Sequence, residues 1–373
     1  MTPLRICIVG LKCYDLLAER ARPRYVGGAE RQQVLLARGL AARGHQVTLV
    51  TLDHGQADGT SHAGVTVRPA YAAAVGVPVL RFFHPRWTGL VRAMRRADPG
   101  IVYQMGGDAE TGQVALWCRA SGRSFVFALA SDADVDPALP LLRTRRQRVL
   151  YRAGLRRARA VVAQTEAQRS QLRAAFAVES TVIRNTSPDP GFAEDGYRQR
   201  AGNEHPRLLW VGRFVPVKRL EVLLDLAAAE PGWDFHVIGS APGSDYGRSL
   251  EARAAALPNV TLHGGISDAS LDEQYRRASV LLSTSSVEGV PTTFLEAWAR
   301  GLPVVSTLDP DNVIASCGLG AVAAPDGLAA AVRAVMSQDP AALSRRIRAH
   351  YLATHTVDAY VARHEQLFLS LRR

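Results

Sequence analysis

The sequence is poor in cysteine and has no long apolar run. Its four cysteines, Cys7, Cys13, Cys118 and Cys317, lack Cys-x-x-Cys spacing and neighbouring histidines, so they indicate neither a zinc site nor a disulfide framework. We expect reduced, mostly buried thiols. The apolar runs have the length of β-strands, and the one near the N-terminus is too short for a signal peptide. These absences favour a cytoplasmic protein with no membrane-spanning segment.

Lysine is almost absent. Among 45 lysine and arginine residues only Lys12 and Lys218 are lysines, and the formal net charge is +11. Such a charge is typical of proteins that bind nucleic acid or anionic membranes. A skew toward arginine along the whole chain is more simply explained by coding bias, and no aromatic residues alternate with the arginines as base stacking requires. We therefore expect no nucleic-acid partner. Lys218 stands out because a compact ammonium is kept at one position.

Short β-branched segments alternate with helical ones along the 373 residues, of which 47% are hydrophobic. This alternation is typical of α/β proteins whose parallel sheets are covered by helices on both faces. The expected strands are 6–10, 47–51, 65–68, 101–104, 125–130, 161–164 and 181–184, and then 208–212, 235–239, 260–263, 280–283 and 304–307.

Two Rossmann-like, doubly wound domains follow from this pattern. The polar stretch 185–206, rich in proline and glycine, predicts a linker. We expect domains at residues 1–187 and 188–355, and a C-terminal helix over 356–373 that could pack on either domain, with the first preferred. Ligands of such folds bind at the carboxyl ends of the strands, so two facing sheets would have a cleft between them.

One chemically informative segment runs from Ser285 to Trp298. Pro291 suits the first turn of a helix, because its missing N–H is not needed there. Amide groups from Gly289 onward, together with the helix N-terminus, would form an anion site for a diphosphate. Glu288 would lie in the loop, and Glu296 would face the ligand from within the helix and accept hydrogen bonds from ribose hydroxyls. Alternatively, Glu288 satisfies the helix dipole and Glu296 is a surface residue.

A second segment, Leu208 to Arg219, contains a strand that is followed by a basic loop. Arg213 and Lys218 would lie at the carboxyl end of this strand, where two cations can neutralise a pyrophosphate leaving group. Two exposed loop cations in a basic protein are the alternative.

The pairing of VGRFVPVKRLEVLLDL with SSVEGVPTTFLEAWARGLPVVST resembles the retaining GT-B glycosyltransferases of family 4, also called group 1. The first domain is also similar in its GGAE and RGHQVTLVT segments. The resemblance implies a GT-B fold and a hexosyltransferase that uses a UDP-, GDP- or ADP-sugar, with no metal required. The implied acceptor is a hydroxyl of a saccharide, of a lipid-linked saccharide or of a small natural product.

The resemblance also implies roles for individual residues. The catalytic group would be Glu288, which holds donor-sugar hydroxyls, with Arg213 and Lys218 on the diphosphate. Glu296 would hold the ribose. Further donor contacts would come from Gly27, Gly28, Ile266, Gly289, Thr292 and Thr293. Attack would occur on the front face of the sugar, and the leaving phosphate would help to remove the acceptor proton.

The acceptor side is less like the family, because no histidine follows the strand at 125–130. Asp132 and Asp134 stand there instead, and with Tyr103 and Asp108 they are the candidate acceptor contacts. An Asp-x-Asp pair is also the metal-binding signature of the GT-A fold, but the basic pair already supplies the charge that an ion would provide.

Eight arginines between Arg143 and Arg159 allow two interpretations. The segment could be a basic amphipathic helix on anionic lipid, which would make the protein peripherally membrane-associated. The simpler interpretation is a solvated helix face. Two other functions stay open: a nucleotide-sugar epimerase or phosphorylase on a related fold, and a non-catalytic basic protein that binds membrane or nucleic acid.

Overall fold

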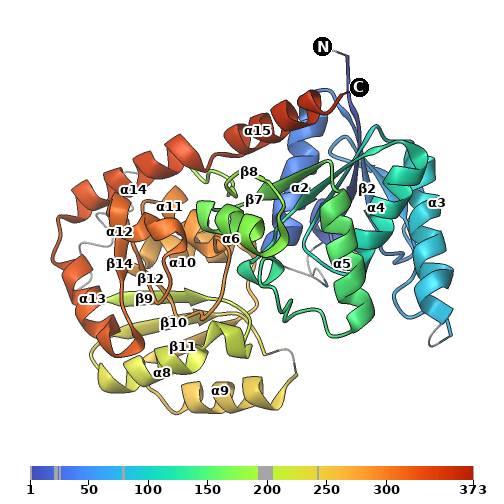
Figure 1. Cartoon of the computed structure of the whole chain (residues 1–373). Helices are drawn as coiled ribbons and strands as arrows, with labels where there is room; N and C mark the ends of the chain where they lie inside the picture. The colour runs from blue at the N-terminus through green and yellow to red at the C-terminus, as the bar shows by residue number, and fades with distance from the viewer. Residues whose placement is uncertain are drawn as a thin grey trace. The chain divides into compact units, whose positions relative to one another are not determined.

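Strands and helices alternate through the computed structural model, which describes residues 2–20, 24, 27–77, 80–191, 205–241 and 243–372 (Figure 1). The chain divides into two units by its internal contacts. Unit 1 comprises Met1–Asn185 and Val357–Arg373, and unit 2 comprises Thr186–Thr356. The α/β fold class predicted from the sequence is confirmed. Within the described residues no helix combines the length and the apolar character needed to cross a bilayer.

Unit 1 is built on a sheet in which eight strands are described, in the order β3-β4-β2-β1-β5-β6-β7-β8. Among these described strands, only β3 and β4 pair antiparallel. The strands are β1 (Arg5–Val9), β2 (Gln46–Thr51), β3 (Ser61–His62), β4 (Val65–Pro69), β5 (Ile101–Met105), β6 (Ser124–Ala128), β7 (Ala160–Ala163) and β8 (Thr181–Val182). The main helices are α1 (Tyr14–Leu17), α2 (Gly28–Ala42), α3 (Thr88–Ala97), α4 (Ala109–Ser121), α5 (Arg145–Arg157), α6 (Glu166–Phe176) and α15 (Val357–Ser370).

The strands of unit 1 are apolar because helices cover both faces of the sheet. Four consecutive residues of β1, from Ile6 to Val9, are buried, which is typical of a central parallel strand. Strand β1 pairs in parallel with β2 on one side and with β5 on the other. On one face α4 and α5 approach closely, since a Cβ on Gly154 would lie 2.6 Å from the Thr111 carbonyl oxygen.

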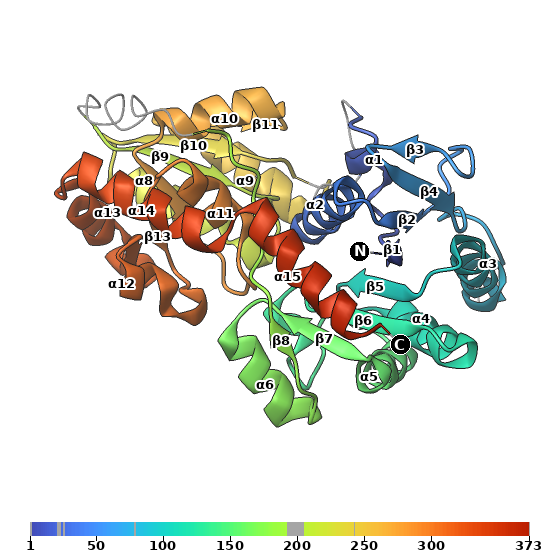
Figure 2. The ribbon, with the colours of Figure 1, turned by 90° about the horizontal axis from the view of Figure 1, so that it is seen from above.

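The last helix, α15, belongs to unit 1. It lies against α2 (Figure 2), and a Cβ on Gly39 of α2 would lie 2.3 Å from Cγ2 of Val361. Arg43 donates to Glu365 at 2.6 Å, and the His45 ring lies 2.8 Å from the same carboxylate. Helix α15 therefore packs into the same hydrophobic core as β1, α2 and β5.

Unit 2 is built on an all-parallel sheet in which six strands are described, in the order β11-β10-β9-β12-β13-β14. The strands are β9 (Arg207–Val211), β10 (Asp234–Ile238), β11 (Val260–Gly264), β12 (Val280–Ser283), β13 (Val304–Ser306) and β14 (Gly320–Val322). The main helices are α8 (Leu220–Ala229), α9 (Asp245–Ala255), α10 (Asp268–Arg277), α11 (Thr292–Ala299), α12 (Val313–Cys317), α13 (Leu328–Met336) and α14 (Pro340–Thr354). Numbered from β9, this order is 3-2-1-4-5-6, the doubly wound order whose direction reverses between β9 and β12.

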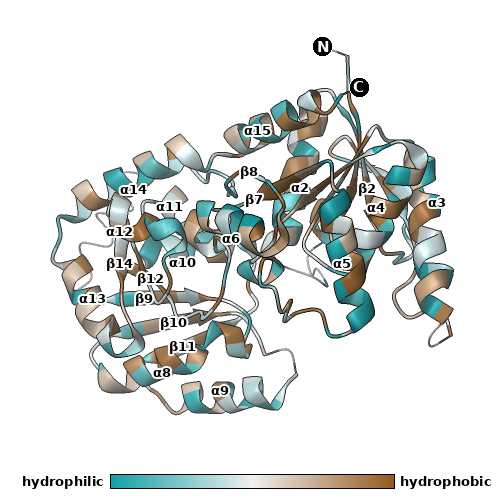
Figure 3. Cartoon of the chain, in the orientation of Figure 1, coloured by the Kyte–Doolittle hydropathy of each residue, from teal (hydrophilic) through white to brown (hydrophobic). Residues whose placement is uncertain are grey.

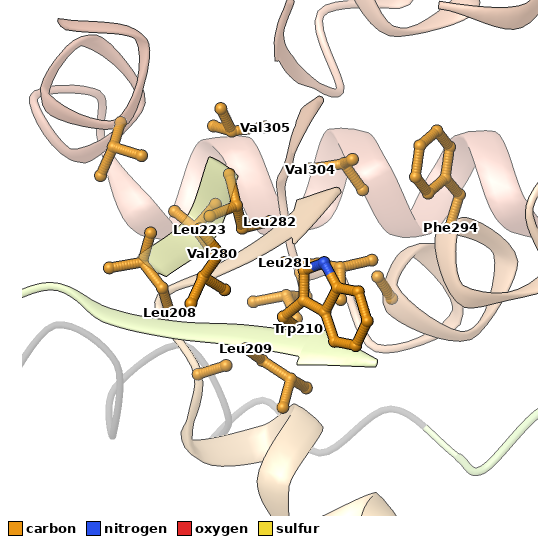
Figure 4. Packing of buried hydrophobic residues seen from close by; sticks show 14 of the residues in the cluster. Leu208, Leu209, Trp210, Leu223, Val280, Leu281, Leu282, Phe294, Val304 and Val305 are labelled. Atoms are coloured by element: carbon orange, nitrogen blue, oxygen red, sulfur yellow. The ribbon is translucent and has the colours of Figure 1, made fainter. Parts of the chain in front are cut away.

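The core of unit 2 gathers side chains from β9, β12, β13 and the helices beside them (Figure 4). Leu208, Leu281 and Phe294 are each at most 1% exposed. Strands β9 and β10 end in a close backbone approach, because a Cβ on Gly239 would lie 1.7 Å from the Gly212 carbonyl oxygen. Gly239 also has a φ of 142°, a region that only glycine adopts without strain.

Each of the expected strands is present, with ends shifted by at most two residues. Two short edge strands, β3 and β14, were not predicted from the sequence. The segment 185–206, predicted as a linker, lies partly outside the described residues. Of the cysteines, Cys7, Cys13 and Cys118 are buried and Cys317 is exposed, and all four are free thiols.

Candidate functional site

The candidate site of unit 2 lies where the strand order reverses. Strand β9 ends at Val211 and is followed by Gly212 and Arg213, and β12 ends at Ser283 and is followed by the loop that contains Glu288. Because β9 and β12 are neighbouring parallel strands, their carboxyl ends lie at the same edge of the sheet. A reversal of strand order separates the following loops and leaves room for a ligand between them.

The two loops are joined by an ion pair between the Nζ atom of Lys218 and the Oε1 atom of Glu288. These side chains are 23% and 17% exposed, so the pair is partly shielded and still within reach of a ligand. Lys218 ends the short helical turn Pro216–Lys218. Its carbonyl oxygen accepts a hydrogen bond from the Thr284 hydroxyl at 2.8 Å, and that hydroxyl accepts one from Nε1 of Trp210 at 3.0 Å. The buried indole of Trp210 in β9 therefore holds the loop that contains Lys218 in place through Thr284.

Arg219 holds the same loops together and was given no role by the sequence analysis. Its φ of 46° turns the chain between Lys218 and α8. Its guanidinium donates to the Thr284 carbonyl oxygen at 2.7 Å and to the Thr307 hydroxyl at 2.9 Å. A single cation thus ties the ends of β9, β12 and β13, and its contacts span distances in sequence that no local pattern reveals.

Helix α11 begins at Thr292, so the predicted helix start near Pro291 is confirmed, although Pro291 precedes the first turn instead of lying in it. Thr292 and Thr293 are half-buried, and Gly289 is buried in the preceding loop. The free amide groups of this first turn, with the positive end of the helix dipole, suit an anion. Arg213 is exposed, and no described residue forms an ion pair with it.

The carboxylate of Glu296 is oriented by a hydrogen bond from a buried tyrosine, which was not predicted from the sequence. The hydroxyl of Tyr275 in α10 donates to Oε2 of Glu296 at 2.7 Å, and the Tyr275 side chain is fully buried. The Arg300 guanidinium lies 4.9 Å from the Tyr275 ring centre and donates to the Glu296 carbonyl oxygen at 2.7 Å. Glu296 is therefore an oriented carboxylate rather than a loose surface residue.

Asp272 completes this support. It accepts from Nε of Arg300 at 2.8 Å and also pairs with Arg276. Burial opposes its charge, but the two guanidinium groups together lower its pKa. Arg300 therefore stays between two acceptors and keeps its place over the Tyr275 ring.

Ile266 follows β11, two strands away from β9, and is half-buried against the unit 2 core. In unit 1, Gly27 and Gly28 form the start of α2, with Gly27 in extended conformation before the first turn. A Cβ on Gly27 would overlap Oε2 of Glu30, so a larger residue there would displace that flexible carboxylate.

Two of the candidate acceptor residues have structural roles. Tyr103 is fully buried in β5, where its ring packs edge-on against His364 and Phe368 of α15, so our prediction of a surface contact is corrected. Asp134 is 6% exposed, and its Oδ2 accepts from the amide of Ala130 at 2.6 Å. Burial raises the pKa of Asp134 against the opposing effect of its backbone donors. Its carboxylate is used to hold the turn after β6.

The other two candidates are exposed at strand ends. Asp132 accepts from Nε2 of Gln168 at 2.9 Å, and Asp108 caps α4 and accepts from Nε2 of Gln147 at 3.0 Å. Both carboxylates keep an open side toward solvent. They follow β6 and β5, which are neighbours in the sheet of unit 1.

Two family models match the chain. Residues 205–338 match the model described as Glycosyl transferases group 1, and residues 27–186 match the Glycosyl transferase 4-like domain. The first contains all the unit 2 residues discussed above, and the second contains the glycine turn, Asp108 and Asp132.

Three similar proteins illustrate the match. D-inositol 3-phosphate glycosyltransferase of Mycolicibacterium smegmatis is 29% identical over 184 residues, which cover 44% of this chain and 41% of that protein. Sucrose-phosphate synthase of Thermosynechococcus elongatus superposes with a TM-score of 0.78 at 20% identity over 98% of both chains. Anabaena HepE, solved in complex with UDP and glucose, superposes with a TM-score of 0.73 at 17% identity over 98% of this chain and 100% of that one.

The sequence matches are partial. They cover between 20% and 41% of the length of the curated relatives. The solved neighbours have the GT-B fold, with its two parallel-sheet domains.

Proposed function

Because the chain belongs to the group 1 family of GT-B glycosyltransferases, we propose that it moves a hexosyl group from a nucleoside-diphosphate sugar to an acceptor hydroxyl, with retention of configuration at the anomeric carbon. The observation that carries the proposal is the Lys218–Glu288 ion pair at the carboxyl ends of β9 and β12. At this point of the sheet edge, Lys218 offers a cation to a diphosphate and Glu288 offers a carboxylate that can accept hydrogen bonds from sugar hydroxyls.

The geometry supports a division of labour among these residues. Arg213 and Lys218 bind the diphosphate and stabilise the negative charge that develops on it as the glycosidic bond breaks. The amides that begin α11, at Thr292 and Thr293, add hydrogen-bond donors to the same phosphates. Glu288 accepts from hydroxyls of the donor sugar once Lys218 has turned to the diphosphate.

Other groups bind the nucleoside of the donor and remove the proton of the acceptor hydroxyl. Glu296, oriented by Tyr275, accepts from the ribose hydroxyls, and Ile266 packs beside the base. Gly27 and Gly28 allow backbone of unit 1 to approach the donor. The acceptor hydroxyl gives its proton to the departing phosphate oxygen while its own oxygen bonds to the anomeric carbon on the same face. The cationic pair supplies the charge, and no metal is required.

The acceptor is proposed to bind to unit 1, with Asp108 and Asp132 holding its hydroxyls. A saccharide, a lipid-linked saccharide or a small natural product fits two exposed carboxylates. We place the enzyme in the cytoplasm, with peripheral membrane contact as part of the proposal. UDP, GDP and ADP are the candidate leaving groups, and the UDP in the Anabaena structure supports the first of these.

Substitution tests the site. Glu288→Gln and Lys218→Ala are each expected to lower turnover by about 100-fold or more, because each removes a charge that stabilises the transition state. A matched control is Glu273→Gln, which breaks an exposed ion pair with Arg277 elsewhere in unit 2 and should leave turnover unchanged. Wild-type turnover in both site variants would remove the assignment.

Product analysis tests the reaction class. A transferase releases nucleoside diphosphate only when acceptor is present, whereas an epimerase yields an isomerised nucleotide sugar. The anomeric coupling constant of the product, read by NMR, decides between retention and inversion.

A further inference from the structure

Unit 1 has a groove lined by aromatic and basic side chains on α3 and on the helical turn before it, η2 (Phe83–Trp87). It has a volume of about 650 Å³. Phe83, Trp87 and Val91 form its apolar part, and Arg92, Arg95 and Arg96 border it. Figure 3 shows hydrophobic ribbon in the helical turns that lead into α3.

Apolar side chains are exposed around this groove. Phe83 is 55% exposed, and Leu80, in the preceding turn, is 62% exposed. Phe83 stacks on Trp87 with ring centres 6.1 Å apart. Large apolar side chains that gather at one surface mark a site of interaction, whereas scattered ones need no explanation.

The charges beside these side chains are positive and mostly uncompensated. Arg92 and Arg95 are exposed, and no described residue pairs with either of them. Arg96 pairs with Asp58 at 2.9 Å, and Asp58 also pairs with Arg68. The surface therefore combines exposed apolar groups with a net positive border, which complements a surface that is apolar inside and anionic at its edge.

Helix α5 contributes charge to this surface and little apolar area. Its Tyr151 and Leu155 are buried, and Gly154 brings α5 against α4. Val149 is the large apolar side chain of α5 that is exposed, at 66%, so most of the apolar stripe of this helix is used inside unit 1. The guanidinium of Arg146, near the start of α5, lies 3.9 Å from the centre of the Phe82 ring and joins this helix to the groove.

We propose that unit 1 docks on a membrane containing anionic phospholipid through this groove. Phe83 and Leu80 enter the boundary between headgroups and acyl chains, Arg92 and Arg95 meet the lipid phosphates, and the arginines of α5 add attraction at longer range. This deepens the membrane contact of the proposed function by naming its face, and it does not depend on transfer activity. A single-stranded nucleic acid fits less well, since Phe83 and Trp87 stack on each other and Leu80 offers no ring to a base.

The test is cosedimentation of the full chain with vesicles of phosphatidylcholine alone or with about one third phosphatidylglycerol. We expect binding only to the anionic vesicles, weakened by salt. Arg92→Gln combined with Arg95→Gln should lower the partition coefficient by about fivefold per arginine at low salt. Leu80→Ser combined with Phe83→Ser should lower it at every salt concentration.

Matched controls make the test specific. Leu352→Ser removes a leucine that is 49% exposed from α14 of unit 2, and Arg156→Gln with Arg157→Gln removes two charges from the far end of α5. Both should bind more tightly than the groove variants. Circular dichroism and thermal unfolding confirm that the variants fold.

Three outcomes would overturn the inference. The wild-type chain does not bind anionic vesicles, or the Arg156→Gln/Arg157→Gln control loses as much vesicle binding as the groove variants. In the third, polyuridylate displaces the wild-type chain from vesicles and binds the Phe83 variant more weakly. Glu288→Gln should bind vesicles normally, so loss of transfer and loss of docking are read separately.

Discussion

At the scale of single residues, the site depends on side chains that act through other side chains. Tyr275 is an example, because its hydroxyl reaches Glu296 at 2.7 Å while its ring stays buried beneath Arg300. It is a positioning residue, because it favours one orientation of the carboxylate that we propose to bind a ribose.

Tyr275→Phe removes only the hydroxyl and should raise the donor KM by about tenfold, since a hydrogen bond to a charged group contributes roughly 1.5–3 kcal/mol. The kcat should change little, because ribose binding is the same in the ground and transition states. Tyr246→Phe, which breaks a tyrosine–glutamate contact with Glu221 between the first turns of α9 and α8 and leaves Glu296 untouched, is the matched control. A fall in kcat at unchanged KM would contradict the positioning role.

Sequence reasoning found the residues that follow strands and missed those that support them. Lys218 and Glu288 stand in the loops that follow two predicted strands, so the topology brings them to the same edge of the sheet. Arg219 and Tyr275 act across loops and helices far apart in sequence, and a single sequence contains no signal for such pairs. The prediction that Tyr103 contacts the acceptor was wrong because of another contact that is distant in sequence. Tyr103 lies at the end of a predicted strand, as expected, but α15 covers its side chain.

At the scale of elements, α15 is held by a buried histidine. His364 is 1% exposed, its ring lies 3.0 Å from the Tyr360 carbonyl oxygen, and it packs against Tyr103 and Phe368. Burial lowers the pKa of His364 to about 4, with the Tyr360 carbonyl opposing the shift. The ring is therefore neutral in the folded chain at neutral pH.

This predicts a loss of stability in mild acid. The unfolded chain binds a proton at His364 near pH 6.5, whereas the folded chain does so only near pH 4. Stability is therefore complete above pH 6.5 and falls as the pH drops toward 4, by about 3 kcal/mol from this residue alone. Urea unfolding of the wild type and of His364→Leu across this range measures the difference, and an equal slope in both would refute the assignment.

Elements differ in how far sequence predicts them. Buried parallel strands such as β9 and β12 are continuous apolar runs, and Pro291 marks the start of helix α11 in the sequence. Strands β3 and β14 are two and three residues long, and they exist through pairing at the sheet edges rather than through a pattern of their own.

At the scale of the whole molecule, the two units carry different parts of the proposed reaction. Unit 2 contains the basic pair, the α11 start and Glu296, so a nucleotide should bind there without an acceptor. The two motif segments of unit 2 and the resemblance to family 4 glycosyltransferases predicted this division, but nothing in the sequence specifies the base or the sugar.

Nucleotide binding should stabilise the protein against heat. A ligand at 100 times its dissociation constant adds about 2.7 kcal/mol, so the preferred diphosphate among UDP, GDP and ADP should raise Tm by several degrees. Arg213→Ala and Lys218→Ala should reduce this shift, while Arg333→Ala, at an exposed ion pair of α13, should not. A full shift in both site variants would place the nucleotide elsewhere.

The return of α15 to unit 1 also orders the events of synthesis. A ribosome completes every residue of unit 2 before it makes Val357, so the first part of unit 1 lacks α15 until then, and Tyr103 is covered only when residues 357–370 emerge. A nonsense mutation near residue 356 would therefore damage the half of the protein that was translated first.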